Sequence, residues 1–118
     1  MVKKILVVDD EEIMRRFLKE VLGMKFDICG EAENGKEAVE KVEDLDPDLV
    51  LLDIQMPKMD GYETFSQIKK IDPDQKVIFC TSVDKDPSKE IDGIYEPEGY
   101  IVKPFKRNKL MRKINDVL

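Results

Sequence analysis

The chain has 118 residues, 42% of them hydrophobic and 39% charged, which is typical of a soluble globular protein with a heavily charged surface. This length predicts one domain over residues 1–118. The absence of histidine excludes histidine-based catalytic triads and zinc sites with histidine ligands. The net charge of −6 argues against direct binding to nucleic acid, because proteins that follow the phosphate backbone carry an excess of lysine and arginine.

Membrane and redox features point to one compartment. The apolar runs, such as residues 5–8, are far shorter than the ~20 residues of a membrane helix, and no signal segment is recognisable. Cys29 and Cys80 lie in apolar stretches without metal-binding or disulfide spacing, so we expect two buried free thiols. These features predict a cytoplasmic protein that does not contact a membrane.

Short apolar runs alternate with amphipathic stretches along the chain, and this order predicts a parallel α/β sheet. The expected strands are residues 5–8, 26–29, 49–52, 77–80 and 100–102. Four of them are continuously hydrophobic, as is typical of strands that helices cover on both faces. Only residues 26–29 alternate, so we expect that strand at an edge of the sheet.

Apolar residues at helical spacing predict the helices between these strands. Their buried faces are Met14, Phe17, Leu18, Val21 and Leu22; Ala38, Val39, Val42 and Leu45; Tyr62, Phe65 and Ile68; and Leu110, Met111, Ile114 and Val117. Gly23 is expected to end the first helix and Asn34 to cap the second. Residues 84–98 contain two prolines, a glycine and few apolar side chains, so a short helix at most is expected there.

Polar side chains follow most of the predicted strands. They are Asp9 and Asp10, Asp53, Thr81 and Ser82, and Lys103 with Pro104. Ligands of an open parallel sheet bind at the carboxyl ends of its strands, so we expect these groups to converge. The three aspartates would carry a charge of −3 in one pocket, and a hard divalent cation such as Mg²⁺, with a backbone carbonyl among its ligands, relieves that repulsion.

The chemistry of these groups favours phosphoryl transfer. Asp53, on the central strand, is the expected nucleophile, because an aspartate can form an acyl phosphate. Lys103 is expected to bind the phosphoryl oxygens as a point charge, and Thr81 to donate its hydroxyl to one of them. Pro104 makes the preceding peptide bond a candidate for the cis form.

These residues resemble the receiver domain of two-component response regulators over essentially the whole chain. The motifs that carry the resemblance are Asp9-Asp10, the LLDIQMPKMDG segment at residues 51–61, Thr81-Ser82 and Lys103-Pro104-Phe105. The resemblance implies a flavodoxin-like fold with a five-stranded, doubly wound sheet in the strand order 2-1-3-4-5. The resemblance fits a stand-alone receiver of the chemotaxis kind and equally a fragment of a longer regulator.

The resemblance also implies a function. Asp53 takes a phosphoryl group from the phosphohistidine of a sensor histidine kinase, with Mg²⁺ held by Asp10, Asp53 and the Gln55 backbone carbonyl, and by Asp9 directly or through water. Thr81 and Tyr100 look like the family's switch pair, which controls a downstream protein at the last strand and last helix. Such a protein catalyses only its own phosphorylation and dephosphorylation, and is not an enzyme with an external substrate.

Two other classes fit the residues less well. A Mg²⁺-dependent aspartyl-phosphate hydrolase needs a second acid two residues after the nucleophile, and that position holds Gln55. A flavin or nucleotide carrier needs a phosphate cradle after the first strand, where residues 9–12 are all acidic.

Residues 103–113 stand apart from the rest of the chain because they contain six cations and no acid. Both a solvated helix face and a docking surface for an acidic partner fit this pattern.

Overall fold

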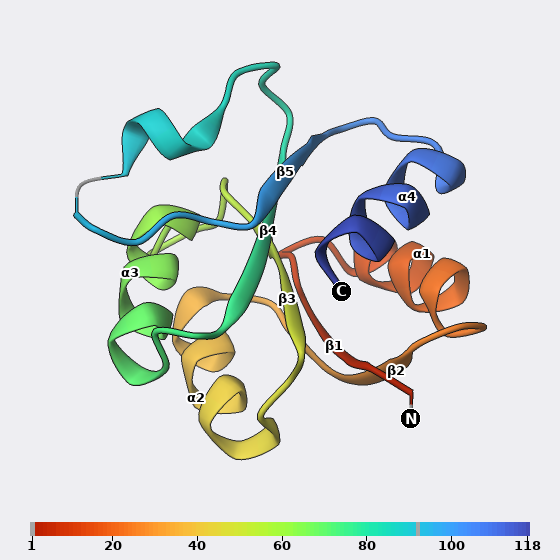
Figure 1. Ribbon diagram of the computed structural model, residues 1–118, viewed down its shortest axis with the longest axis horizontal. Helices are drawn as coiled ribbons and strands as arrows, with labels where there is room; N and C mark the ends of the chain where they lie inside the picture. The colour runs from red at the N-terminus through yellow and green to blue at the C-terminus, as the bar shows by residue number, and fades with distance from the viewer. Residues whose placement is uncertain (1, 92) are drawn as a thin grey trace.

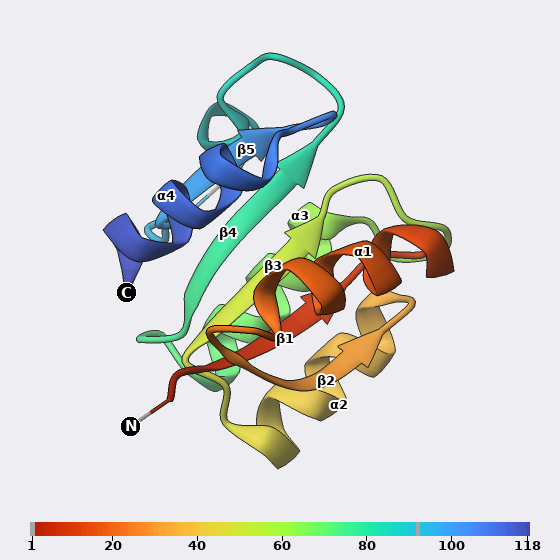
Figure 2. The ribbon, with the colours of Figure 1, turned by 90° about the vertical axis from the view of Figure 1, so that its right-hand side faces the viewer.

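The computed structural model describes residues 2–91 and 93–118 and contains one five-stranded sheet (Figure 1). The strands are β1 (Lys4–Val8), β2 (Asp27–Ala32), β3 (Leu49–Asp53), β4 (Lys76–Thr81) and β5 (Gly99–Val102). All neighbouring strands are parallel, and their order is β2-β1-β3-β4-β5 (Figure 2). The predicted fold class and strand order are confirmed.

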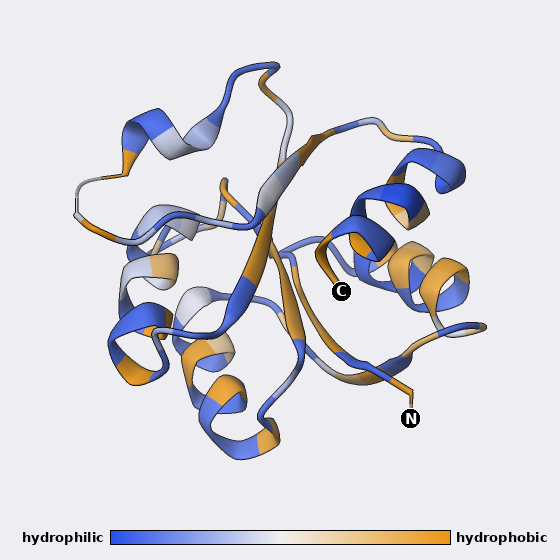
Figure 3. Cartoon of the chain, viewed as in Figure 1, coloured by the Kyte–Doolittle hydropathy of each residue, from blue (hydrophilic) through white to orange (hydrophobic). Residues whose placement is uncertain are grey.

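Helices cover both faces of the sheet, as the continuous hydrophobicity of the inner strands requires. Helices α1 (Glu12–Leu22) and α4 (Arg107–Val117) lie on one face, and α2 (Gly35–Leu45) and α3 (Gly61–Ile71) on the other (Figure 1). Each pair of helices packs its apolar side chains against alternate residues of the strands and so forms one of two buried clusters. Figure 3 shows the inner strands as hydrophobic and the outer surface of α4 as hydrophilic.

Strand β2 differs most from the prediction. It starts one residue later than expected and continues to Ala32, because Glu31 and Ala32 pair with the end of β1. It is an edge strand as predicted, but Cys29 on this strand is half-buried, so the prediction of a buried thiol was wrong there. Cys80, on an inner strand, is buried, and burial raises the pKa of its thiol to about 12. An edge strand lacks a neighbouring strand on one side. Its pattern of apolar residues therefore predicts neither the length of the strand nor the burial of its side chains accurately.

The predicted helix ends are confirmed. The side chain of Asn34 accepts a hydrogen bond from the backbone N–H of Glu37 (2.9 Å), as an N-cap does. Gly23 stands immediately after the last residue of α1.

Residues 84–98 contain a short helix, as expected. A 3₁₀-helix, η1 (Pro87–Glu90), follows Asp86, whose carboxylate accepts a hydrogen bond from the Ser88 backbone N–H (2.9 Å). In the described part of this segment Pro87 is buried, and Ile91 and Tyr95 pack, partly buried, against the core. The segment is therefore attached to the domain by few apolar contacts.

Amide exchange is expected to be faster in residues 84–91 than in residues 49–52 of β3, because few buried contacts oppose local opening of that segment. Exchange in this segment is expected to slow when beryllofluoride and Mg²⁺ are added. Hydrogen-exchange mass spectrometry on the same sample, with and without the additives, measures both effects. Equal protection of the two segments before addition would contradict this prediction.

Candidate functional site

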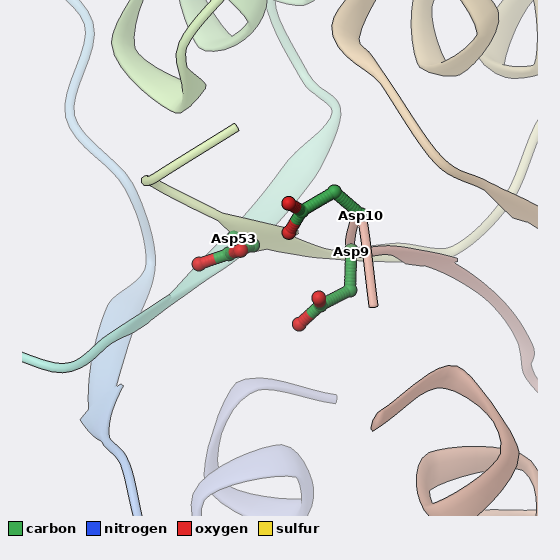
Figure 4. Close-up of side chains that lie close together, drawn as sticks. All are labelled: Asp9, Asp10 and Asp53. Atoms are coloured by element: carbon green, nitrogen blue, oxygen red, sulfur yellow. The ribbon is translucent and has the colours of Figure 1, made fainter. Parts of the chain in front are cut away.

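The carboxyl ends of the inner strands bring the predicted acids together. Asp9 follows β1, Asp10 is the next residue, and Asp53 is the last residue of β3. Carboxylate oxygens of the three side chains lie within 4.8 Å of one another (Figure 4). Asp9 and Asp53 are buried, whereas Asp10 is exposed, so the cluster opens to solvent on one side. This arrangement matches the prediction from the sequence.

Lys103 is the cation of this cluster. Its Nζ donates a hydrogen bond to Asp9 Oδ2 (2.8 Å) and lies 3.5 Å from Asp53 Oδ1. Burial acts to lower the pKa of Lys103, but the hydrogen bond to Asp9 and the charges of both aspartates outweigh burial and raise it. Lys103 therefore remains positively charged. The peptide bond between Lys103 and Pro104 is cis, as predicted.

Asp53 has an unusual acidity for an aspartate. Burial raises its pKa to about 6, against the charge of Lys103, and the neighbouring charge of Asp9 adds to the rise. A hydrogen bond from the Gln55 backbone N–H acts in the opposite direction. Three carboxylates and one ammonium group leave a charge of −2, which a divalent cation would neutralise. The three carboxylates supply oxygen ligands, which suit Mg²⁺.

The loop after Asp53 is held close to β3 by a glycine. A Cβ atom on Gly61 would lie 2.5 Å from the Asp53 carbonyl oxygen and 2.6 Å from the Ile54 Cα, so a side chain does not fit here. The Gly61 N–H donates to the Ile54 carbonyl (2.8 Å). This contact places Gln55 beside the acids, where its side-chain Oε1 accepts a hydrogen bond from Ser82 Oγ (3.3 Å).

Thr81 and Tyr100 lie on the same face of the sheet. Thr81 is two residues after Phe79, the register partner of Tyr100, and side chains two apart on a strand share a face. The Thr81 Oγ1 accepts a hydrogen bond from the Val83 backbone N–H (3.1 Å), so its hydroxyl belongs to a local turn. Tyr100 is half-buried against the cluster beneath α2 and α3.

An open cavity of about 270 Å³ adjoins the acids between β4 and η1. It is lined by Ile54, Gln55, Tyr62, Thr81, Val83, Lys85, Asp86, Pro87 and Glu90. Val83 is 52% exposed at this cavity. An apolar side chain thus stands beside the polar residues that line this cavity.

Sequence reasoning missed two charged residues near the site. Arg15 on α1 donates a hydrogen bond to the Asp9 carbonyl (2.8 Å) and another to Glu31 of β2 (2.8 Å). Helical spacing places Arg15 beside the buried face of α1, three and seven residues before Leu18 and Leu22, and places Arg16 on the opposite side, but it does not identify the partner of Arg15.

The six cations of residues 103–113 do not lie together in the structure. Lys103 contacts the acidic cluster, whereas the others lie at the start of α4 or along it (Lys106, Arg107, Lys109, Arg112 and Lys113). None of these five forms a salt bridge with an acid in the described part of the chain. Among the described residues, no helix is both long and apolar enough to cross a membrane.

Comparisons with known proteins agree on one family. The family model described as "Response regulator receiver domain" matches residues 5–115. The chain is similar to the chemotaxis protein CheY of Halobacterium salinarum, with 46% identity over 100% of this chain and 98% of that protein. It is 41% identical to CheY of Bacillus subtilis over 100% of this chain and 99% of that protein.

A solved structure is also similar. This is a chain of the CheX-CheY-BeF3-Mg²⁺ complex from Borrelia burgdorferi, with a TM-score of 0.88 and 33% identity. The match covers 98% of this chain and 88% of that one.

Proposed function

Because the chain belongs to the response regulator receiver domain family, whose members are signalling proteins, we propose that Asp53 accepts a phosphoryl group from the phosphohistidine of a sensor histidine kinase. The observation that carries this proposal is the buried carboxylate of Asp53, which lies within 4.8 Å of two other aspartates and 3.5 Å from Lys103. We propose that residues 1–118 form one receiver domain.

Asp9, Asp10 and Asp53, together with the backbone carbonyl of Gln55, would hold Mg²⁺ at this site. Their oxygen donors and their charge of −3 fit a hard divalent cation. When bound, the cation neutralises charge on the phosphoryl oxygens. A related structure that contains both Mg²⁺ and BeF3 supports this assignment.

The other steps of phosphoryl transfer are carried out by side chains of this protein. Asp53 supplies the attacking oxygen, and the Lys103 ammonium group, already 3.5 Å from it, binds an oxygen of the phosphoryl group. Thr81 leaves its turn with Val83 and donates its hydroxyl to another phosphoryl oxygen. Tyr100, half-buried on the same sheet face, then turns further inward. The result is a population shift between two packings of one fold.

The surface of β5 and α4 fits a downstream protein target with acidic side chains. Helix α4 has no acid in its first turn, and Lys106 and Arg107 stand at its N-terminal end, where cations oppose the helix dipole. An acidic partner would relieve this unfavourable arrangement. Tyr100 on β5 would connect this surface to the state of Asp53.

Acetyl phosphate, a small-molecule phosphoryl donor, tests the proposed function directly. We expect the intact mass of the protein to rise by one phosphoryl group when Mg²⁺ is present and to stay unchanged when the metal is chelated. A protein that gains no phosphoryl group from acetyl phosphate or from any histidine kinase of its host would contradict the proposal.

The lifetime of the acyl phosphate is expected to be long. Hydrolysis requires a water in line with the Asp53 oxygen, and Gln55 and Val83, which stand two residues after Asp53 and Thr81 and line the cavity, are our candidates to orient it. The Val83 side chain can neither donate nor accept a hydrogen bond. The substitutions Val83→Glu and Val83→Asn are therefore expected to accelerate phosphate loss several-fold, by about 1 kcal/mol of barrier. Decay rates after removal of the donor test this, and unchanged or slower decay in both variants would contradict it.

A further inference from the structure

Arg15 connects the acidic cluster to the edge of the sheet. Its Nη1 donates to the carbonyl oxygen of Asp9 (2.8 Å), and its Nε donates to Glu31 Oε1 on β2 (2.8 Å). The side chain of Arg15 is only 12% exposed. We propose that Arg15 is a positioning residue that holds Asp9 and Asp10 in the geometry that binds the divalent cation; this inference rests on the proposed function.

The Asp9 carbonyl oxygen that accepts from Arg15 belongs to the planar peptide unit between Asp9 and Asp10. The position of this oxygen therefore fixes the backbone from which both side chains extend. The Asp9 N–H donates to the Ala32 carbonyl (3.0 Å), so both backbone polar groups of Asp9 are held.

Without a cation, the carboxylates oppose this geometry. Three of them lie within 4.8 Å of one another, and Lys103 contacts Asp9 and Asp53 but forms no salt bridge with Asp10. Rotation of the peptide unit between Asp9 and Asp10 would let the exposed carboxylate of Asp10 move away. A charge-assisted hydrogen bond from Arg15 resists that rotation, so less free energy is needed to assemble the ligands when the cation arrives.

Glu31 holds Arg15 in turn. Its Oε1 accepts from Arg15, and its Oε2 accepts from Lys19 Nζ (2.5 Å). The Lys41 ammonium group donates to the backbone carbonyl of Glu31. Hydrogen bonds from Lys19 and Arg15 lower the pKa of Glu31, so its carboxylate stays ionised at neutral pH. The edge strand therefore supplies a fixed anion that orients the guanidinium group.

Arg16 provides a matched control on the same helix. It carries the same charge, but its side chain is 67% exposed and its ion pair with Glu12 is long (3.6 Å). Replacing either arginine by glutamine changes the net charge by the same amount, and only the Arg15 substitution removes a contact with the acidic cluster.

The test is Mg²⁺ binding by isothermal titration calorimetry to the full chain and to the variants Arg15→Gln and Arg16→Gln. We expect Arg15→Gln to weaken Mg²⁺ binding by about 10- to 100-fold, as loss of a group that orients metal ligands typically does. Arg16→Gln should change it by less than about two-fold. Coulomb's law alone predicts the opposite sign for Arg15→Gln, because removing a positive charge near a cation site strengthens cation binding. Unchanged or tighter binding by Arg15→Gln would overturn the inference.

Further variants separate positioning from general stability. Arg15→Lys keeps the charge but cannot span both partners, so its Mg²⁺ affinity should lie between those of the parent and Arg15→Gln. The parent rate of phosphorylation by acetyl phosphate should return in Arg15→Gln at saturating Mg²⁺, which a general loss of stability would not produce. A rate that stays low at saturating Mg²⁺ would overturn the inference.

If Arg15→Gln does not fold, Glu31→Gln decides the question. It leaves Arg15 without its ionic anchor and should weaken Mg²⁺ binding several-fold, so unchanged affinity would overturn the inference. A parent chain that binds no Mg²⁺ would overturn the proposed metal site and this inference together. A parent that binds Mg²⁺ with the same affinity as Arg15→Gln would overturn this inference alone.

Discussion

Asparagine at position 53 is expected to abolish the gain of one phosphoryl group that acetyl phosphate and Mg²⁺ produce in the parent chain. A carboxylate oxygen can attack phosphorus and form an acyl phosphate, whereas a carboxamide lacks that nucleophilic anion. Asparagine has nearly the same size and can accept the hydrogen bond from the Gln55 backbone N–H, so the variant should keep its fold. The loss is therefore expected to be complete rather than partial.

A matched control is available on α2. Asp44 is exposed and lies outside the acidic cluster, so Asp44→Asn makes the same change in charge without touching the site. Intact-mass spectrometry should show the full gain in Asp44→Asn and none in Asp53→Asn. An equal gain in Asp53→Asn would show that another side chain carries the phosphoryl group.

Mg²⁺ is expected to raise the free energy of unfolding of the parent chain by about 2.7 kcal/mol at about 100 times its Kd. The cation relieves the repulsion among three carboxylates that the fold holds within 4.8 Å of one another. Thermal unfolding in a series of Mg²⁺ concentrations measures this effect. A thermal midpoint that does not respond to millimolar Mg²⁺ in a normally folded protein would contradict the metal site.

The pH dependence of the metal-free protein measures the cost of burying the Asp53 carboxylate, to which repulsion from Asp9 adds. The folded pKa of Asp53 is about 6, above the ordinary value of 3.8, so the folded chain binds this proton more tightly than the unfolded chain. The stability that Asp53 contributes is therefore complete below pH 3.8 and is lost as the pH rises to about 6. Asp53→Asn should stabilise the metal-free protein more at about pH 7.5 than at about pH 4.5. An equal gain in thermal midpoint at both pH values would contradict the raised pKa.

Much of this protein was determined by local patterns in its sequence. Continuous apolar runs such as residues 49–52 marked the inner strands, because strands covered on both faces cannot expose polar side chains. Helical spacing of apolar residues marked the four α-helices, and Asn34 marked a helix start through its own side chain. The acids were predictable as a cluster because the carboxyl ends of parallel strands meet at one edge of a sheet.

Other features depended on contacts between residues far apart in the chain. The length of β2 and the partial exposure of Cys29 follow from pairing at an edge, where one side of the strand has no neighbour. Lys103 was predicted at the site because it follows the last strand, whereas its hydrogen bond to Asp9, 94 residues away in sequence, depends on where β5 ends in the sheet. Helical spacing separates Arg15 from Arg16, but only the packing of α1 against β1 and β2 brings Arg15 to the Asp9 carbonyl. Short-range periodicity reports which face of an element is buried, whereas the partner of a charged side chain is decided by which elements the fold brings together.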